Sequence, residues 1–236
     1  MKLLPLFLSA FLFASCNGDK GKDGKNGGSG SDGSGASAAE SDRQNGPFSD
    51  RKSGLRDIVV IETSMGTIKA KLHRSTAPIT VDNFLTYVDK KHYDNTIFHR
   101  VISDFMIQGG GFEMSGQFPK EKETGKGITN ESADSKKNTT GTLAMARTND
   151  PNSATAQFFI NVEDNKNLDY PSMGGYAVFG EVIEGMEVVN AIKNVPTGTS
   201  MALSLLPNGR YNSSPFQNVP EEPVTIKSIR RASQSE

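Results

Sequence analysis

A break in composition near residue 55 limits what this chain of 236 residues can fold into. Residues 17–54 consist mainly of glycine, serine, aspartate, lysine and asparagine, with almost no apolar side chains. Such a segment cannot bury enough apolar surface to offset the entropy of ordering its backbone. The part that can form a core is therefore residues 55–236, which is the size of one ordinary domain.

The N-terminal residues have the pattern of an export signal. Lys2 is followed by an apolar run over residues 3–13 and then by Ala14, Ser15 and Cys16. The run is too short to span a bilayer permanently, as in a cleaved signal peptide. Small residues before a single cysteine resemble a bacterial lipoprotein signal. This resemblance implies a signal peptide over residues 1–15, lipidation of Cys16 and a flexible tether over residues 16–54, which would reach about 35 Å.

The alternative is an ordinary secreted chain in which Cys16 merely lies near the cleavage site. Phe13 keeps this alternative open, because lipoprotein signals usually carry leucine at that position. If Cys16 is lipidated, the domain has no thiol and cannot form a disulfide, because the chain has one cysteine. Asn17 differs from the aspartate that retains some lipoproteins at an inner membrane. We therefore expect a lipid-anchored protein of the cell envelope, with the outer membrane favoured.

Charge and ligand counts argue against two other classes of function. The formal net charge is −1, with basic and acidic residues mixed along the chain, so no basic stripe is available for nucleic acid. Three histidines and one cysteine are too few and too scattered for a metal site of recognisable spacing. We expect no metal, no cofactor and no nucleic-acid partner.

The sequence pattern of the domain predicts many short strands and two helices. Residues 58–63 and 67–72 flank a tight turn, and the second segment alternates apolar and polar side chains. A helix is predicted from Pro78 to Lys91, with Val81, Phe84, Leu85 and Val88 at helical spacing, and a second over residues 186–192. Further strands are predicted over residues 97–101, 105–108, 141–146, 158–162, 177–182 and 224–230.

Residues 98–110, with the sequence FHRVISDFMIQGG, suit holding a peptide rather than cleaving one. Apart from Ser103 in a predicted turn, they contain no serine or cysteine nucleophile, and no second carboxylate lies near Asp104 for acid–base work. Arg100 is the strong electrostatic group, because a guanidinium stays charged and carries a rigid fork of donors. We expect His99 to face away from Arg100 by strand alternation.

Together with the stretches GTLAMAR (141–147), AQFFIN (156–161) and GYAVFGEV (175–182), this segment closely resembles the cyclophilin family of peptidyl-prolyl isomerases, over residues 58–229. The resemblance implies a mainly β fold, a closed eight-stranded antiparallel barrel capped by two α-helices. It also implies peptidyl-prolyl cis-trans isomerase activity without a covalent intermediate, on proline-containing segments of unfolded or exported proteins. A monomer is expected.

The resemblance also implies roles for individual residues. Arg100 would be the catalytic donor, and the substrate-binding residues would be Phe105, Met106, Gln108, Ala146, Arg147, Gln157, Phe159, Leu168 and Tyr176. Phe98, Phe158 and Phe179 are expected in the core. Asn167 occupies a position where many eukaryotic members carry tryptophan, so we expect weak cyclosporin inhibition. Arg147 and Tyr176 also depart from common relatives, which carry asparagine and histidine.

The sequence leaves two questions open, which concern catalysis and the role of residues 201–214. A non-catalytic cyclophilin-like module that binds proline-containing partners on the cell envelope would need the same pocket as the enzyme, so the pocket residues do not separate these two functions. Residues 201–214 resemble an insertion relative to compact bacterial members and predict a hairpin, which either packs on its own barrel or meets a partner. We expect the hairpin to pack on its own barrel.

Overall fold

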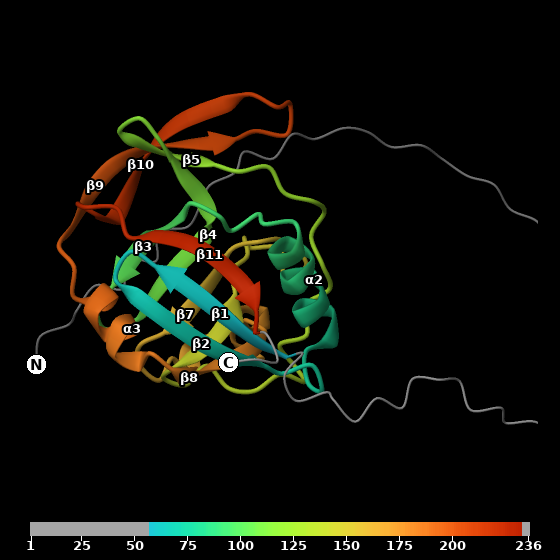
Figure 1. The fold of residues 1–236 in the computed structure, drawn as a ribbon. Helices are drawn as coiled ribbons and strands as arrows, with labels where there is room; N and C mark the ends of the chain where they lie inside the picture. The colour runs from blue at the N-terminus through green and yellow to red at the C-terminus, as the bar shows by residue number, and fades with distance from the viewer. Residues whose placement is uncertain (1–56, 233–236) are drawn as a thin grey trace, which may run out of the picture. The chain divides into compact units, whose positions relative to one another are not determined.

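The computed structural model describes residues 57–232 (Figure 1). The predicted signal peptide over residues 1–15, Cys16 and the tether lie outside these residues. Within residues 57–232, no helix has the length and apolar character needed to cross a bilayer.

Eight antiparallel strands close into a barrel, which confirms the predicted mainly β architecture. The strands are β1 (Ile58–Thr63), β2 (Gly66–Leu72), β3 (Thr96–Ile102), β4 (Met106–Ser115), β6 (Thr142–Met145), β7 (Phe158–Asn161), β8 (Val178–Glu184) and β11 (Thr225–Arg231). Around the ring their order is β4, β3, β11, β1, β2, β8, β6 and β7. The pairing of β7 with β4 closes the ring, so every barrel strand has a hydrogen-bonded neighbour on both sides.

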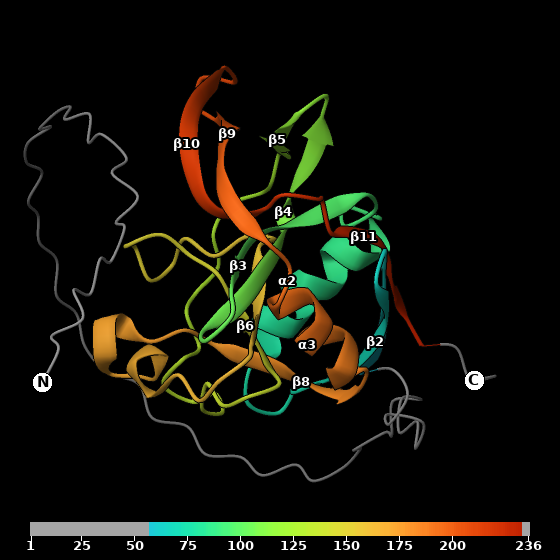
Figure 2. The same ribbon diagram turned by 90° about the vertical axis from the view of Figure 1, so that its left-hand side faces the viewer.

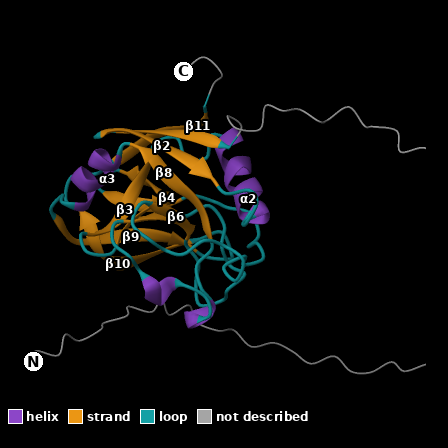
Figure 3. Cartoon of the chain, turned by 90° about the horizontal axis from the view of Figure 1, so that it is seen from below, coloured by secondary structure: helices purple, strands orange, loops and turns teal. Residues whose placement is uncertain are grey.

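Two helices add apolar side chains to the barrel core. Helix α2 (Pro78–Asp89) starts with proline in its first turn and buries Val81, Phe84, Leu85 and Val88, as the spacing predicts. Helix α3 (Met186–Lys193) buries Val188, Val189 and Ile192. These residues belong to the same apolar cluster as the inward side chains of the strands. The helices lie on opposite sides of β1 and β2 (Figures 1 and 3).

Strand β4 is longer than predicted, because three consecutive glycines continue the strand instead of ending it. Gly110 has a φ of +85°, and a Cβ there would lie 2.8 Å from Cε1 of Tyr93. Gln157 likewise occupies the space that a side chain at Gly111 would need. The glycines therefore let core and site residues pack directly against the strand backbone.

Three further strands extend the sheet outward from β4. Strand β5 (Phe118–Glu121), which the sequence pattern did not predict, pairs with β4 and meets β9 (Thr197–Leu205), which pairs with β10 (Tyr211–Pro220). Figure 2 shows this β9–β10 hairpin and β5 projecting beyond the barrel. Ala202, Phe216 and Val219 of the hairpin are buried against Ile97 and Phe112 of the barrel. The predicted hairpin over residues 201–214 thus packs on its own barrel and is longer at both ends.

Candidate functional site

A second apolar cluster lies on the outer wall of the barrel. Successive side chains of a strand point to opposite faces. On β7, Phe158 therefore belongs to the barrel core and Phe159 to the outer cluster. On β4, Ile107 and Met106 divide in the same way. We call the outer group the pocket cluster: Met106, Ala144, Phe159, Leu168 and Val178, with the partly buried Ile102, Phe105, Ala146 and Tyr176 around them.

The pocket cluster unites six of the nine predicted substrate-binding residues: Phe105, Met106, Ala146, Phe159, Leu168 and Tyr176. The rings of Phe159 and Tyr176 meet edge to face, with centroids 5.8 Å apart. Sequence reasoning missed Ile102, Ala144 and Val178. Alternation along β6 could have identified Ala144, because it lies between Leu143 and Met145, both in the core.

Two predicted amides lie together beside the pocket cluster. Nε2 of Gln108 donates a hydrogen bond to Oε1 of Gln157 at 3.0 Å. Gln108 is opposite Phe159 on β7, and the carbonyl of Gln157 accepts a hydrogen bond from the amide of Ala146 at 2.9 Å. The two side-chain amides still carry unused donors and acceptors, which could bind the main chain of a peptide.

Arg100 is opposite Gln108 in the pairing of β3 with β4. Its guanidinium is half-buried and forms no hydrogen bond or salt bridge to any side chain or backbone group within residues 57–232. Burial lowers the pKa of Arg100, but an arginine is not deprotonated in proteins, so the charge stays. A partly desolvated guanidinium whose donors form no hydrogen bond to the described residues is available for a ligand.

Arg147 lies near the pocket cluster, but its side chain is occupied by the protein. Its Nε and Nη2 donate to the carbonyl of Gly175 at 3.0 and 2.9 Å, and Nη2 also donates to the carbonyl of Met173 at 2.6 Å. The guanidinium lies over the ring of Tyr176, 4.3 Å from its centroid. Arg147 therefore holds a loop and one wall of the cluster through its side chain.

His99 is buried against the β9–β10 hairpin, and only 3% of it is exposed. Its ring lies 4.5 Å from Phe112 and 6.4 Å from Phe216, between centroids. Burial, with a smaller effect from the charge of Arg100, lowers its pKa to about 3. The imidazole is thus neutral and structural, as strand alternation predicts.

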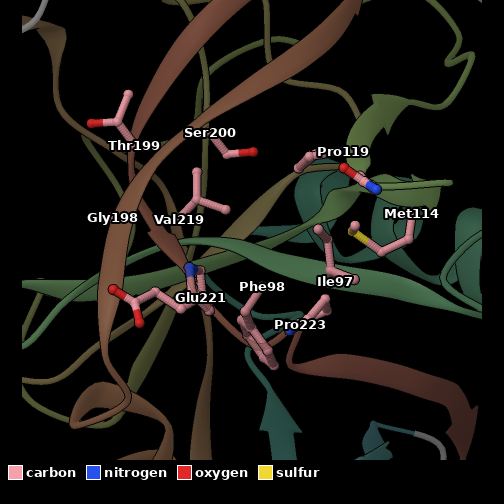
Figure 4. A pocket seen from close by; sticks show the side chains of 12 residues that line it. Ile97, Phe98, Met114, Pro119, Gly198, Thr199, Ser200, Val219, Glu221 and Pro223 are labelled. Atoms are coloured by element: carbon pink, nitrogen blue, oxygen red, sulfur yellow. The ribbon is translucent and has the colours of Figure 1, made fainter.

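A separate pocket of about 260 Å³ lies where the hairpin meets β3 to β5 (Figure 4). Its wall includes Ile97, Met114, Pro119, Val219 and Glu221. None of the predicted site residues lines it. Elsewhere, residues 57–232 contain no group of three histidine, cysteine or acidic side chains that could hold a metal ion.

The candidate site consists of the pocket cluster, the amide pair and the guanidinium of Arg100. These features define a class of closed β-barrel protein in which the candidate site lies on the outer wall. Residues 58–231 match the family described as cyclophilin type peptidyl-prolyl cis-trans isomerase/CLD. The chain belongs to this family and is an isomerase.

Curated relatives extend the similarity to bacteria. The chain is 51% identical over 176 residues to the peptidyl-prolyl cis-trans isomerase cyp18 of Streptomyces antibioticus. The aligned region covers 73% of this chain and 96% of the relative. It is 48% identical over 176 residues to peptidyl-prolyl cis-trans isomerase B of Escherichia coli, and this alignment covers 73% of this chain and 98% of the relative. A crystal structure of a Cryptosporidium parvum cyclophilin with the dipeptide Ala-Pro matches with a TM-score of 0.57 at 29% identity, covering 75% and 99%.

Proposed function

We propose that the pocket cluster holds a proline ring and that Arg100 stabilises the twisted X-Pro bond, in peptide segments of unfolded or exported proteins. Rotation about an X-Pro bond is slow because the amide is conjugated, with a barrier of roughly 18–20 kcal/mol. No covalent bond has to break. The enzyme needs only to bind the twisted amide more tightly than either planar isomer.

The geometry supports a division of roles. The apolar side chains of the pocket cluster suit the proline ring, and the amides of Gln108 and Gln157 suit the flanking main chain. Rotation deconjugates the amide nitrogen, which then becomes a hydrogen-bond acceptor. We assign this donor role to Arg100, and its position opposite Gln108 supports the assignment.

The observation that carries this proposal is the half-buried guanidinium of Arg100, which forms no hydrogen bond or salt bridge in the described part of the chain. A partly desolvated charge costs free energy unless a ligand repays that cost. The Ala-Pro dipeptide present with the Cryptosporidium parvum relative is a ligand of the proposed kind.

The test is exchange NMR of a short Ala-Pro peptide with the full chain and its Arg100→Ala variant. We expect the variant to lose isomerase activity by a factor of about 10² to 10³, as when one preorganised donor is removed. Arg210→Ala is the matched control, because Arg210 is an exposed arginine in the turn of the β9–β10 hairpin. Peptide binding without acceleration by the unsubstituted chain would favour the binding-module alternative.

We also infer that Cys16 is lipidated and anchors the enzyme to a membrane of the cell envelope, with the outer membrane favoured. The support is sequence alone, since residues 1–16 lie outside the described part. We expect palmitate to label the unsubstituted protein but not the Cys16→Ser variant. We also expect the variant to leave the membrane fraction. A labelled Cys16→Ser protein would contradict the anchor.

We further infer that α2 and α3 cap the barrel and that the isolated domain is a monomer. The buried faces of both helices join the barrel core from opposite sides (Figure 1). The closed ring gives the eight barrel strands two partners each, so none of them is a free edge. A single species of monomer mass in light scattering is the expected result.

A further inference from the structure

We propose that Asn138, Asn161 and Asn165 form a positioning network that fixes the loop-borne half of the pocket cluster. This inference rests on the proposed function, because it concerns how the same pocket is kept in shape. The three residues are 2%, 0% and 6% exposed. They are too deeply buried to touch a bound peptide, so they act through other residues.

The pocket cluster has two kinds of wall. Met106 and Phe159 lie on β4 and β7, whose pairing fixes their backbones. Phe105 lies in the turn before β4, Leu168 ends a short 3₁₀ helix and Tyr176 lies in a loop. No strand ladder fixes these three residues, so their positions depend on other hydrogen bonds.

The asparagine network begins at the Phe105 wall. Nδ2 of Asn165 donates to the main-chain carbonyl of Phe105 at 2.8 Å and to Oδ1 of Asn161 at 2.7 Å. Nδ2 of Asn161 in turn donates to Oδ1 of Asn138 at 3.2 Å and to Oγ1 of Thr142 at 2.9 Å. Asn161 is therefore the central link, at the end of strand β7.

The network ends at the other two loop-borne walls. Nδ2 of Asn138 lies within hydrogen-bonding distance of the main-chain carbonyls of Leu168, at 3.3 Å, and Tyr176, at 3.2 Å. Asp169 fixes the same asparagine, since its carboxylate accepts from the Asn138 backbone amide at 2.8 Å. Three side chains thus connect the backbones of Phe105, Leu168 and Tyr176.

This arrangement has a consequence for catalysis. Stabilising a twisted amide requires walls that keep their positions while the bond rotates, since misplacement by about 1 Å can cost up to 10²-fold in rate. Buried amide networks with satisfied partners rigidify the groups they join. The asparagine network would therefore raise the rate of exchange of the bound peptide. The amides of Gln108 and Gln157, which lie outside the network, would still bind the main chain.

The primary variant is Asn165→Ala in the full chain, which removes the bonds to Phe105 and Asn161. The carbonyl of Phe105 keeps its hydrogen bond from the Val162 amide, so this turn retains an anchor. The matched control is Thr96→Val, which removes one buried hydrogen bond, from Thr96 Oγ1 to the Tyr93 carbonyl, and involves no pocket residue. Asn161→Thr is the second variant, because it keeps a hydroxyl at this buried position but is too short to reach either asparagine partner.

Exchange NMR of an Ala-Pro peptide would measure the exchange rate at saturation and the peptide dissociation constant, both normalised to folded protein. For Asn165→Ala we expect an exchange rate about tenfold lower, with the dissociation constant changed less than about threefold, whereas Thr96→Val keeps both values. For Asn161→Thr, which breaks the links to both Asn138 and Asn165, we expect a loss of about tenfold as well.

Unchanged exchange in the folded Asn165→Ala variant overturns the inference. If Asn165→Ala does not fold, unchanged exchange in Asn161→Thr overturns it instead. An equal loss in Thr96→Val would show that the effect is general destabilisation, and would also overturn it. An unsubstituted chain that binds the peptide without accelerating exchange refutes the proposed function instead, so the two failures are distinguishable.

Discussion

His99 should make the folded domain sensitive to acid. The ring is buried beneath the β9–β10 hairpin, against the rings of Phe112 and Phe216. Its pKa falls from 6.5 to about 3 on folding, mainly through burial. Below pH 6.5 the imidazole therefore binds a proton in the unfolded chain but stays neutral in the folded chain. The free energy of unfolding consequently declines as the pH falls from 6.5 towards 3.

The size of the effect follows from this shift. Each pH unit inside the window is worth about 1.36 kcal/mol for one proton. At about pH 4.5 the contribution of His99 to the free energy of unfolding is therefore lower by roughly 2–3 kcal/mol than at neutral pH. His99→Leu replaces the ring with an apolar side chain of similar volume that does not titrate. The variant should lose this share of the pH dependence, whatever its stability at pH 7.

Urea unfolding of the unsubstituted chain and of His99→Leu, each at neutral pH and at about pH 4.5, gives the change in unfolding free energy with pH for each protein. The difference between these two changes is the contribution of His99, because the carboxylates common to both proteins cancel. His92→Gln is the control, since His92 also has a pKa lowered by burial but is only partly buried and hydrogen-bonds the Gly110 carbonyl. It should change the pH dependence less. Equal pH dependence in His99→Leu and the unsubstituted chain would refute the reasoning. Because Arg100 stays charged, activity in acid should follow the folded fraction.

Three further substitutions test other parts of the structure. Gly110→Ala should lower the free energy of unfolding by about 2–4 kcal/mol, through a Cβ 2.8 Å from Tyr93 at φ +85°. Gly116→Ala, at φ +62° in open space, should cost about 1 kcal/mol, and equal urea midpoints would contradict the steric argument. Arg147→Lys should lower kcat/KM about tenfold by releasing its loop, and an unchanged peptide exchange rate would contradict that. Asn167→Trp should strengthen cyclosporin inhibition about tenfold, and an unchanged inhibition constant would count against a role for this position.

The sequence predicted most clearly what local periodicity controls. Helix α2 follows from Pro78 and the spacing of Val81, Phe84, Leu85 and Val88. Strand β4 could not be bounded, because three glycines in a row usually indicate a break, and here they admit Tyr93, Phe158 and Gln157 from distant segments. Strand β5 is short and contains Pro119, and its partners are defined by tertiary pairing.

In the candidate site too, the features carried by local motifs were predicted, and those that depend on contacts between distant segments were not. Resemblance to cyclophilins predicted Arg100 and six residues of the pocket cluster, and all of these except Leu168 lie in the four quoted motifs. The direction of the Arg147 side chain could not be predicted, since its acceptors are carbonyls of residues 173 and 175. The role proposed for Asn138 was missed for a related reason, because the pocket residues that it contacts, Leu168 and Tyr176, are bound through main-chain carbonyls, which no side-chain pattern reports.

The dipeptide Phe158-Phe159 shows why stability and activity are separable in this barrel. Phe158 is fully buried and contacts Phe84, Tyr93 and Phe98 in the barrel core. Phe159 points to the opposite face, where its ring meets Tyr176. Because one strand supplies both the core and the pocket cluster, core packing fixes the backbone from which the site residues project. The outer face can therefore change its side chains for binding without altering the packing that holds the barrel closed.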